Sequence, residues 1–259
     1  MRTLKMTAMT VLIILLGLLL VHWLTGGQQE IVDRTYEPKE SAMPGNPPLP
    51  NTVAGFQAAF DDLDLYDWGG GDGALTTVLE DGRLVWFFGD TLTKRGGIVW
   101  MPRNTSIVQT GRKMHAVNDG VQVIPTTEHY VYWPLKVKET RRNHITVWTE
   151  KIKLTGTGVF SFKRVRPSMA RQARLKVLAN GDMKFLGWGE WVPQPFDKYS
   201  APPDGEGARI IGPGHWGYAR MVHYDLPLAN GKYLVTECQN WDDGQTRSTR
   251  EYRPMLSAE

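Results

Sequence analysis

Cysteine is nearly absent from this sequence, because Cys238 is the only one among 259 residues. A single cysteine excludes an intrachain disulfide, so the fold depends on its hydrophobic core, which a domain of about 200 residues can supply. Cys238 ends the strand-like run that begins at Tyr233. We therefore expect a small buried residue here rather than a catalytic thiol.

A surplus of basic charge is also missing. The chain has 30 Lys and Arg against 27 Asp and Glu, and Arg2 and Lys5 precede a hydrophobic segment. Without residues 1–27 the balance is 28 against 27, so the overall charge gives no sign of a nucleic-acid partner.

Motifs that bind metals or cofactors are lacking too. The six histidines show no metal-ligand spacing, and the glycines at 69–71 are not followed by the Gly-Lys-Ser/Thr of a phosphate loop. The aspartates at 61–67 lack the glycine and the distal glutamate of a calcium loop. The sequence thus predicts neither a metal nor a cofactor.

The N-terminus holds a long uncharged stretch. No charged side chain occurs between Lys5 and Glu30, and residues 11–24 are almost wholly aliphatic. A basic flank before an apolar run is typical of a signal anchor or a cleaved signal peptide, and both remain open. Either one predicts that the following domain lies in the periplasm or outside the cell, and an anchor makes the membrane a partner.

The rest divides into a tether and one domain. Residues 28–54 contain five prolines and few apolar residues, which indicates an extended linker. The predicted organisation is a signal anchor or signal peptide at 1–27, a proline-rich tether at 28–54 and a β domain at 55–259, which we expect to be monomeric.

Residues 55–259 show short apolar or alternating runs separated by turn residues, which favours an all-β fold. Three hairpins are predicted around Gly82, Gly181 and Gly231, where Asp-Gly or Asn-Gly supplies the backbone conformation of tight turns. Leu-Ala-Asn-Gly occurs at both 178–181 and 228–231. A period near 50 residues favours a radial repeat of small sheets, and the length allows a β-propeller of four blades or five trimmed ones.

Two aspartates flank the first hairpin. Asp72 follows three glycines and precedes the first strand, and Asp90 follows Gly89 at the end of the second. Folding back at Gly82 places both at one end of the hairpin, and the flanking glycines would let a ligand approach the backbone. Two converging carboxylates are the requirement for glycoside hydrolysis. The alternative is that each aspartate binds local amides in a turn.

These motifs resemble a known family. Trp-Gly-Gly-Gly-Asp-Gly at 68–73, Trp-Phe-Phe-Gly-Asp-Thr at 86–91 and Arg-Asn-Thr at 103–105 are similar to the opening of five-bladed β-propellers long described as a domain of unknown function and now grouped as endo-D-arabinanases. The resemblance is good over residues 56–110 and looser beyond. It implies a five-bladed propeller with a carbohydrate site at the mouth of its channel and with Asp72 and Asp90 as the catalytic pair.

Further residues are candidates for substrate binding. Arg103 and Asn104 follow the hairpin and could hold hydroxyl groups or orient a carboxylate. Glu190 lies between two tryptophans as a possible third acid. The run from 214 to 220 carries aromatic, imidazole and guanidinium groups between glycines, and its alternative role is to fill a blade core. Its candidate residues are His215, Trp216, Tyr218 and Arg220.

The sequence thus favours an enzyme, a glycoside hydrolase that uses Asp72 and Asp90 on an envelope or extracellular polysaccharide that resembles D-arabinan. The alternative is a non-catalytic β-propeller that binds a glycan or a protein at the cell surface.

Overall fold

The computed structural model describes residues 46–63, 68–95, 98–155, 162–166, 168–194, 209–212, 215–241 and 254–259. The hydrophobic segment at 1–27 and most of the tether lie outside the described residues. Within the described ranges, no helix is long and apolar enough to cross a membrane.

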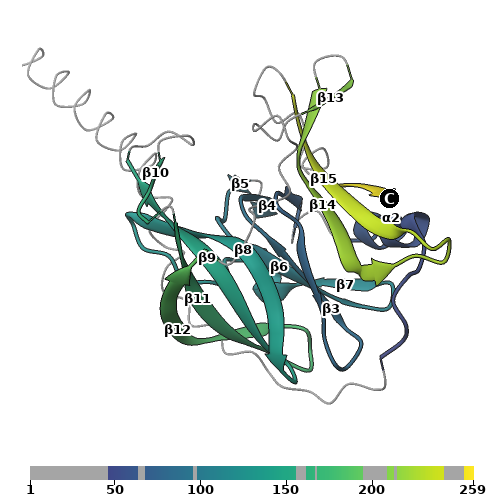
Figure 1. Cartoon of the computed structure of the whole chain (residues 1–259), viewed down its shortest axis with the longest axis horizontal. Coiled ribbons are helices and arrows are strands. Elements are labelled where there is room, and N and C mark those ends of the chain that lie inside the picture. The colour runs from purple at the N-terminus through teal and green to yellow at the C-terminus, as the bar shows by residue number, and fades with distance from the viewer. Residues whose placement is uncertain are drawn as a thin grey trace, which may run out of the picture.

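The described residues form mostly antiparallel β-sheets (Figure 1). We name three large sheets by their position. The central sheet consists of β2 (Leu75–Val78), β3 (Leu84–Phe88), β6 (Thr105–Thr110) and β7 (Lys113–Ala116). The second sheet consists of β8 (Tyr130–Arg141), β9 (His144–Leu154), β10 (Phe162–Arg164), β11 (Met169–Val177) and β12 (Met183–Pro193).

The third large sheet, the C-terminal sheet, consists of β13 (Arg209–Gly212), β14 (His215–Pro227), β15 (Tyr233–Trp241) and β16 (Met255–Ala258). A short sheet consists of β1 (Gly70–Gly71), β4 (Thr91–Arg95) and β5 (Ile98–Trp100). A 3₁₀ turn, η1 (Val117–Gly120), follows β7.

All three predicted hairpins are present, as β2–β3, β11–β12 and β14–β15. Gly82, Gly181 and Gly231 have φ angles of 84°, 96° and 76°, the left-handed region that glycine tolerates best. The repeated Leu-Ala-Asn-Gly nevertheless joins strands that are not equivalent. β12 is an edge strand of its sheet, whereas β14 and β15 are both interior. The spacing of 50 residues therefore does not mark one repeated sheet.

The central sheet is buried on both faces, which explains the uninterrupted apolar sequence of β3. Val85 and Phe87 point into a core shared with the second sheet. Leu84, Trp86 and Phe88 point the other way, into a core shared with the C-terminal sheet. Because successive side chains of β3 point to opposite faces, this strand packs against both the second sheet and the C-terminal sheet.

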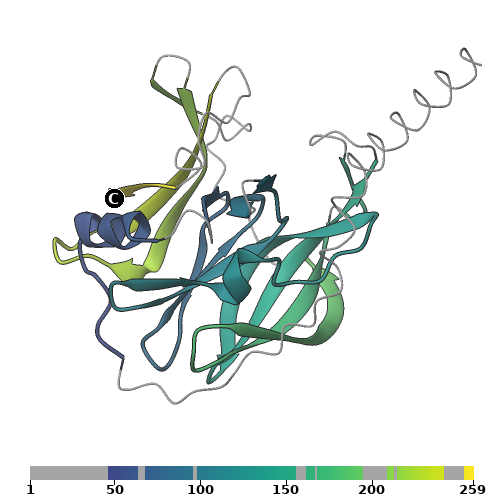
Figure 2. The same ribbon diagram turned by 180° about the vertical axis from the view of Figure 1, so that it is seen from behind.

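The three sheets fan out from neighbouring strands, since β2 contacts both β8 and β14 (Figures 1 and 2). Thr76 on β2 hydrogen-bonds His223 and Asp225 on β14 at 2.8 and 3.1 Å. The all-β prediction is confirmed in this form, as several antiparallel sheets with one described helix. The described sheets do not define a closed ring, so the five-bladed propeller stays a prediction.

One α-helix was not predicted from the sequence. α2 (Val53–Asp61) begins after Thr52, whose hydroxyl accepts a hydrogen bond from the Gly55 amide, and it buries Phe56 and Phe60 against the central and C-terminal sheets. The last residues of the predicted tether also contact the β domain, because the Asn46 side chain donates to the carbonyl of Asp81.

Candidate functional site

Asp72 and Asp90, which we name the acid pair, lie side by side at one end of the β2–β3 hairpin. The Asp72 amide donates to the Asp90 carbonyl at 3.0 Å, and the Gly89 amide donates to the Asp72 carbonyl at 2.8 Å. The backbone ladder of the hairpin thus continues past β2 and β3 to the two aspartates. This is the convergence that the sequence predicted from the turn at Gly82.

The glycines around the acid pair allow close packing between protein segments. A Cβ at Gly89 would overlap the Asp72 carboxylate oxygen Oδ1, and a Cβ at Gly71 would lie 2.8 Å from Thr91 Oγ1. From the sequence, these glycines are expected to let a ligand approach the backbone. The structure gives Gly71 and Gly89 a different role, which is to let the strand ends and the Asp72 side chain fit together.

Asp90 is held by two donors. Arg103 donates from its guanidinium to Asp90 Oδ2 at 2.9 Å, and Trp133 donates from its indole to Oδ1 at 2.9 Å. The side chains of Arg103 and Asp90 are 14% and 16% exposed, so this ion pair is only partly screened by water. Burial raises the pKa of Asp90 above its ordinary value, and the hydrogen bonds and the Arg103 charge partly offset that rise.

Asp72 has a different environment. Burial, followed by the negative charge of Asp90, raises the pKa of Asp72 well above its ordinary value. Asp72 keeps part of its surface accessible, although protein atoms surround its carboxyl group closely. Cys238 lies beneath it, with Sγ 3.2 Å from the Gly73 amide, and this thiol is 3% exposed. The prediction of a buried structural cysteine is confirmed.

Each residue of the motif Arg103-Asn104-Thr105 binds a different group near Asp90. Arg103 binds the carboxylate itself. The fully buried Asn104 side chain accepts from the amides of Val123 and Ile124, at 3.1 and 2.7 Å, and donates to backbone carbonyls. Asn104 therefore positions the backbone near Trp133, because its side-chain amide group hydrogen-bonds only backbone atoms in these contacts.

The third member of the motif is part of a buried chain of hydroxyl groups. Thr105 Oγ1 lies 2.8 Å from Thr91 Oγ1, and Thr91 donates to the Gly89 carbonyl at 3.1 Å. The indole of Trp68 donates to Thr105 Oγ1 at 3.2 Å. This chain fixes the backbone on both sides of Asp90 and explains why threonine follows the aspartate.

The other predicted site residues are not brought to the acid pair by any contact that the structure describes. Glu190 is exposed on the edge strand β12. Arg220 forms an ion pair with Glu259 in the C-terminal sheet. Backbone positions 215, 216 and 218 belong to β14, but the side chains of His215, Trp216 and Tyr218 lie outside what the structure describes.

Trp133 was missed as a site residue. The sequence drew attention to Tyr132-Trp-Pro-Leu only as a loose part of the family resemblance. A tryptophan before a proline near the start of a predicted strand was the available signal, but its contact with Asp90 joins residues 43 positions apart.

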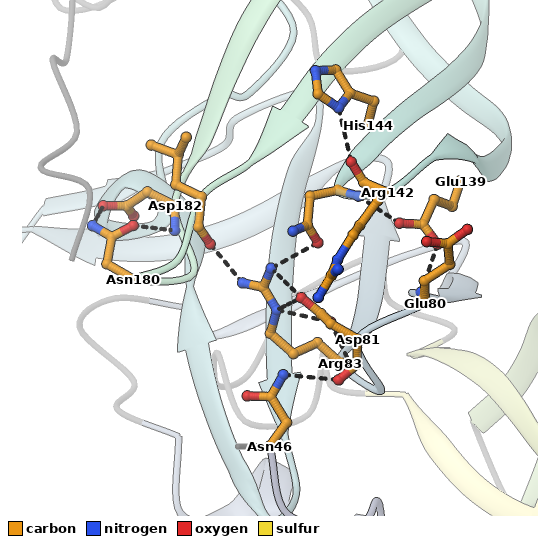
Figure 3. A network of polar contacts seen from close by, with 11 residues as sticks. Asn46, Glu80, Asp81, Arg83, Glu139, Arg142, His144, Asn180 and Asp182 are labelled. Carbon is orange, nitrogen blue, oxygen red and sulfur yellow. Dashed lines mark hydrogen bonds and ion pairs between the residues drawn. The ribbon is translucent and has the colours of Figure 1, made fainter. Parts of the chain in front are cut away.

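A second polar cluster lies at the opposite end of the same hairpin (Figure 3). The buried Arg83 binds both carboxylate oxygens of Asp81, and it also donates to the Asn143 side chain and the Leu178 carbonyl. The cluster thereby ties the central sheet to the second sheet. Burial alone would raise the pKa of Asp81, but hydrogen bonds and charge from Arg83 lower it overall.

Comparisons with known proteins give limited information. Residues 56–182, about half of the chain, match the family described as a domain of unknown function, DUF5005. This range includes the acid pair, Arg103 and Trp133 and ends before β12. No curated protein matches the chain.

Two solved structures show distant similarity. One is a candidate hydrolase from Bacteroides ovatus ATCC 8483, with 18% identity and a TM-score of 0.39, and the alignment covers 77% of this chain and 58% of that one. The other is a protein of unknown function from Dyadobacter fermentans DSM 18053, with 12% identity and a TM-score of 0.26, covering 71% and 40%. This chain spans less than two thirds of either protein, and both are too distant to transfer a function. Its similarity to the DUF5005 family over residues 56–182 is therefore the most informative match.

Proposed function

We propose that this chain is a glycoside hydrolase in which Asp72 donates the proton and Asp90 acts as the ionised partner. The observation that carries the proposal is that Asp72 and Asp90 are adjacent and that Arg103 forms an ion pair with Asp90 alone. Two neighbouring carboxylates repel each other, so the pair retains a proton on the member without a cation. That member is Asp72, whose pKa is raised furthest by burial and by Asp90.

The chemistry follows from this assignment. Protonated Asp72 gives its proton to the glycosidic oxygen as the bond to the anomeric carbon breaks. Asp90 either removes a proton from the attacking water or attacks the anomeric carbon itself, and the separation of the two carboxyl groups in a substrate complex distinguishes these routes. Arg103 and Trp133 keep Asp90 ionised and oriented.

The family resemblance makes D-arabinan the first substrate to test and a five-bladed propeller the proposed fold. Contact of β2 with both β8 and β14 supports a radial arrangement of the sheets. The hydrophobic segment at 1–27 and the prolines of 28–54 support a domain held at the outer face of a membrane, near a polysaccharide of the cell envelope.

The test is incubation of the full chain with arabinans and other envelope glycans, with released reducing ends as the readout. Asp72→Asn and Asp90→Asn should each lower the rate by about 10²- to 10⁴-fold, which is the usual contribution of general acid–base groups. Asp81→Asn is the matched control, because it makes the same change at the other end of the hairpin. Full activity in both acid-pair variants would exclude the mechanism.

One observation favours the alternative of a non-catalytic glycan-binding domain. Both oxygens of Asp90 already accept a hydrogen bond, as in a carboxylate with a structural role. Under that alternative, the chain retains a glycan in affinity electrophoresis but releases no reducing ends, and Asp90→Asn weakens the retention.

A further inference from the structure

The segment that forms the second sheet carries an excess of positive charge. Residues 130–193 contain thirteen Lys and Arg but four Asp and Glu, a net charge of +9. The remaining 195 residues contain 17 basic and 23 acidic side chains, a net charge of −6. The small overall charge of +3 therefore hides a separation of charge between one sheet and the rest of the molecule.

Five of these thirteen cations share one face of this sheet. Side chains alternate along a strand, and Val137, Val147 and Leu175 belong to the core shared with the central sheet. The residues between them face the other way. These outward positions carry the cations Lys136, Lys138, Arg174, Lys176 and Lys184, which we name the basic face.

The strand register arranges the basic face in rows. Lys138 and Arg174 both pair with Thr146 from opposite sides, so the two cations flank one residue of β9. Lys176 pairs directly with Lys184 across β11 and β12. Like charges at directly opposed positions of a sheet repel each other, and an anionic ligand that contacts both ammonium groups would screen this repulsion.

Two of the four acidic residues of this segment are engaged by other groups, whereas Glu190 is exposed on β12. The Glu139 carboxylate accepts hydrogen bonds from the amides of Glu80 and Asn143 at 2.7 and 2.6 Å. Glu150 is 2% exposed and forms an ion pair with Arg164. Trp148 lies on the basic face, where the Lys136 ammonium sits 5.9 Å from its ring, so the cations there are accompanied by an aromatic platform.

We propose that the basic face binds an anionic polysaccharide, one whose sugars carry carboxylate or phosphate groups. The identification of the polymer as a glycan rests on the proposed function, whereas the existence of the surface does not. β8 contacts β2, the strand that Asp72 precedes. The basic face lies beside the turn end of the β2–β3 hairpin, where Glu139 accepts from the Glu80 amide and the Leu178 carbonyl accepts from Arg83. Only an extended polymer can therefore contact both this face and the acid pair at the other end.

The regularity of the surface favours a polymer over a lipid bilayer. Cations at fixed positions on paired strands are preorganised for a ligand with regularly spaced charges, whereas mobile headgroups need no such order. Export behind the hydrophobic segment, as the sequence predicts, favours a glycan over a nucleic acid.

The test compares two charge-reversed variants of the full chain. One carries Lys138→Glu, Arg174→Glu and Lys184→Glu on the basic face. The control carries Lys113→Glu and Lys232→Glu, which are exposed positions on β7 and in the β14–β15 turn. The probes are polygalacturonate, a neutral arabinan, duplex DNA and vesicles with acidic phospholipid, each measured by affinity electrophoresis or sedimentation at several salt concentrations.

We expect polygalacturonate to bind the unaltered chain with a steep salt dependence, the basic-face variant to bind at least about tenfold more weakly, and the control to change less than twofold. Binding of polygalacturonate is measured without any readout of hydrolysis, so it does not depend on the activity of the acid pair. If no glycan is hydrolysed, the binding result still stands. If polygalacturonate does not bind, the proposed hydrolysis is not affected. Equal binding by both charge-reversed variants, or tighter binding to DNA or vesicles than to polygalacturonate, overturns the proposal.

Folding of the basic-face variant is checked by thermal unfolding. Lys184→Glu places an acid opposite Lys176, and the variant counts as folded when its thermal unfolding remains cooperative. The neutral variant Lys138→Gln with Arg174→Gln should show an intermediate loss of binding. If the charge-reversed variant does not fold, an unchanged affinity of the neutral variant is enough to reject the proposal.

Discussion

The two ends of the β2–β3 hairpin use aspartate in opposite ways. At the turn, Asp81 forms an ion pair with the buried Arg83, and the hydrogen bonds and charge of Arg83 lower the pKa of Asp81. At the open end, Arg103 binds Asp90 and not Asp72, and the pKa of each aspartate is raised, that of Asp72 most. One end is electrostatically satisfied and holds sheets together, whereas the other is not and can therefore exchange a proton.

The largest effect on stability is expected at the satisfied end. Arg83→Met leaves the Asp81 carboxylate, the Leu178 carbonyl and the Asn143 side chain without their shared donor. Removing one partner of a buried ion pair costs about 3–5 kcal/mol. Urea unfolding of the variant should show this loss as a lower midpoint, and a change below about 1 kcal/mol would show that the cluster does not hold the two sheets together.

The same substitution should act with opposite sign at the two ends. Asp81→Asn removes a favourable charge and should lower the free energy of unfolding by about 1–3 kcal/mol. Asp72→Asn replaces a carboxyl group whose ionisation is disfavoured by burial and by Asp90 with a neutral amide, and it should raise the free energy of unfolding by about 1 kcal/mol at pH 7. Chemical denaturation at pH 7 measures both, and a loss of stability in both variants would contradict the comparison.

The pH dependence follows the same signs. Because the folded pKa of Asp81 is lowered, its contribution is present above the ordinary value of 3.8 and is lost as the pH falls through the folded value. Because the folded pKa of Asp72 is raised, its charge destabilises the folded state above that pKa, and protonation relieves this as the pH falls toward 3.8. In Asp72→Asn, the pH dependence of the free energy of unfolding that comes from Asp72 should disappear, and the dependence that comes from Asp81 should remain.

The two Leu-Ala-Asn-Gly turns offer a smaller comparison. Gly181 and Gly231 both have positive φ angles, but a Cβ at Gly181 would lie 2.9 Å from the His115 ring, whereas a Cβ at Gly231 would meet nothing within 4 Å. Replacement with alanine should cost about 1 kcal/mol of backbone strain at both sites, with an additional cost at Gly181. Thermal unfolding of the two variants checks the difference, and equal losses would show that the His115 contact is unimportant.

The sequence predicted local structure better than long-range contacts. Turn residues at Gly82, Gly181 and Gly231 fixed three hairpins because a tight turn depends on a few adjacent residues. The same hairpin brought Asp72 and Asp90 together, so the acid pair could be placed before the structure was known. Trp133 could not, since its contact with Asp90 depends on how the second sheet packs beside β2.

The uneven distribution of charge along the chain was not recognised from the net charge. A total of +3 concealed a segment of +9, because composition averages over residues that the fold separates. Strand alternation then decides which charges share a face, and this requires a register. Helix α2 was missed because a helix of only nine residues is too short to give a clear periodic signal.

The central claim is that the acid pair keeps a proton on Asp72 while Asp90 is ionised. Carbon-13 NMR titration of the aspartate carboxyl groups in the full chain, assigned with Asp72→Asn, Asp90→Asn and Asp81→Asn, tests it most directly. The account predicts that Asp72 titrates well above 3.8, that its pKa falls in Asp90→Asn without returning to the ordinary value, and that Asp81 titrates below 3.8. Titration of Asp72 at or below 3.8, together with Asp81, would contradict it.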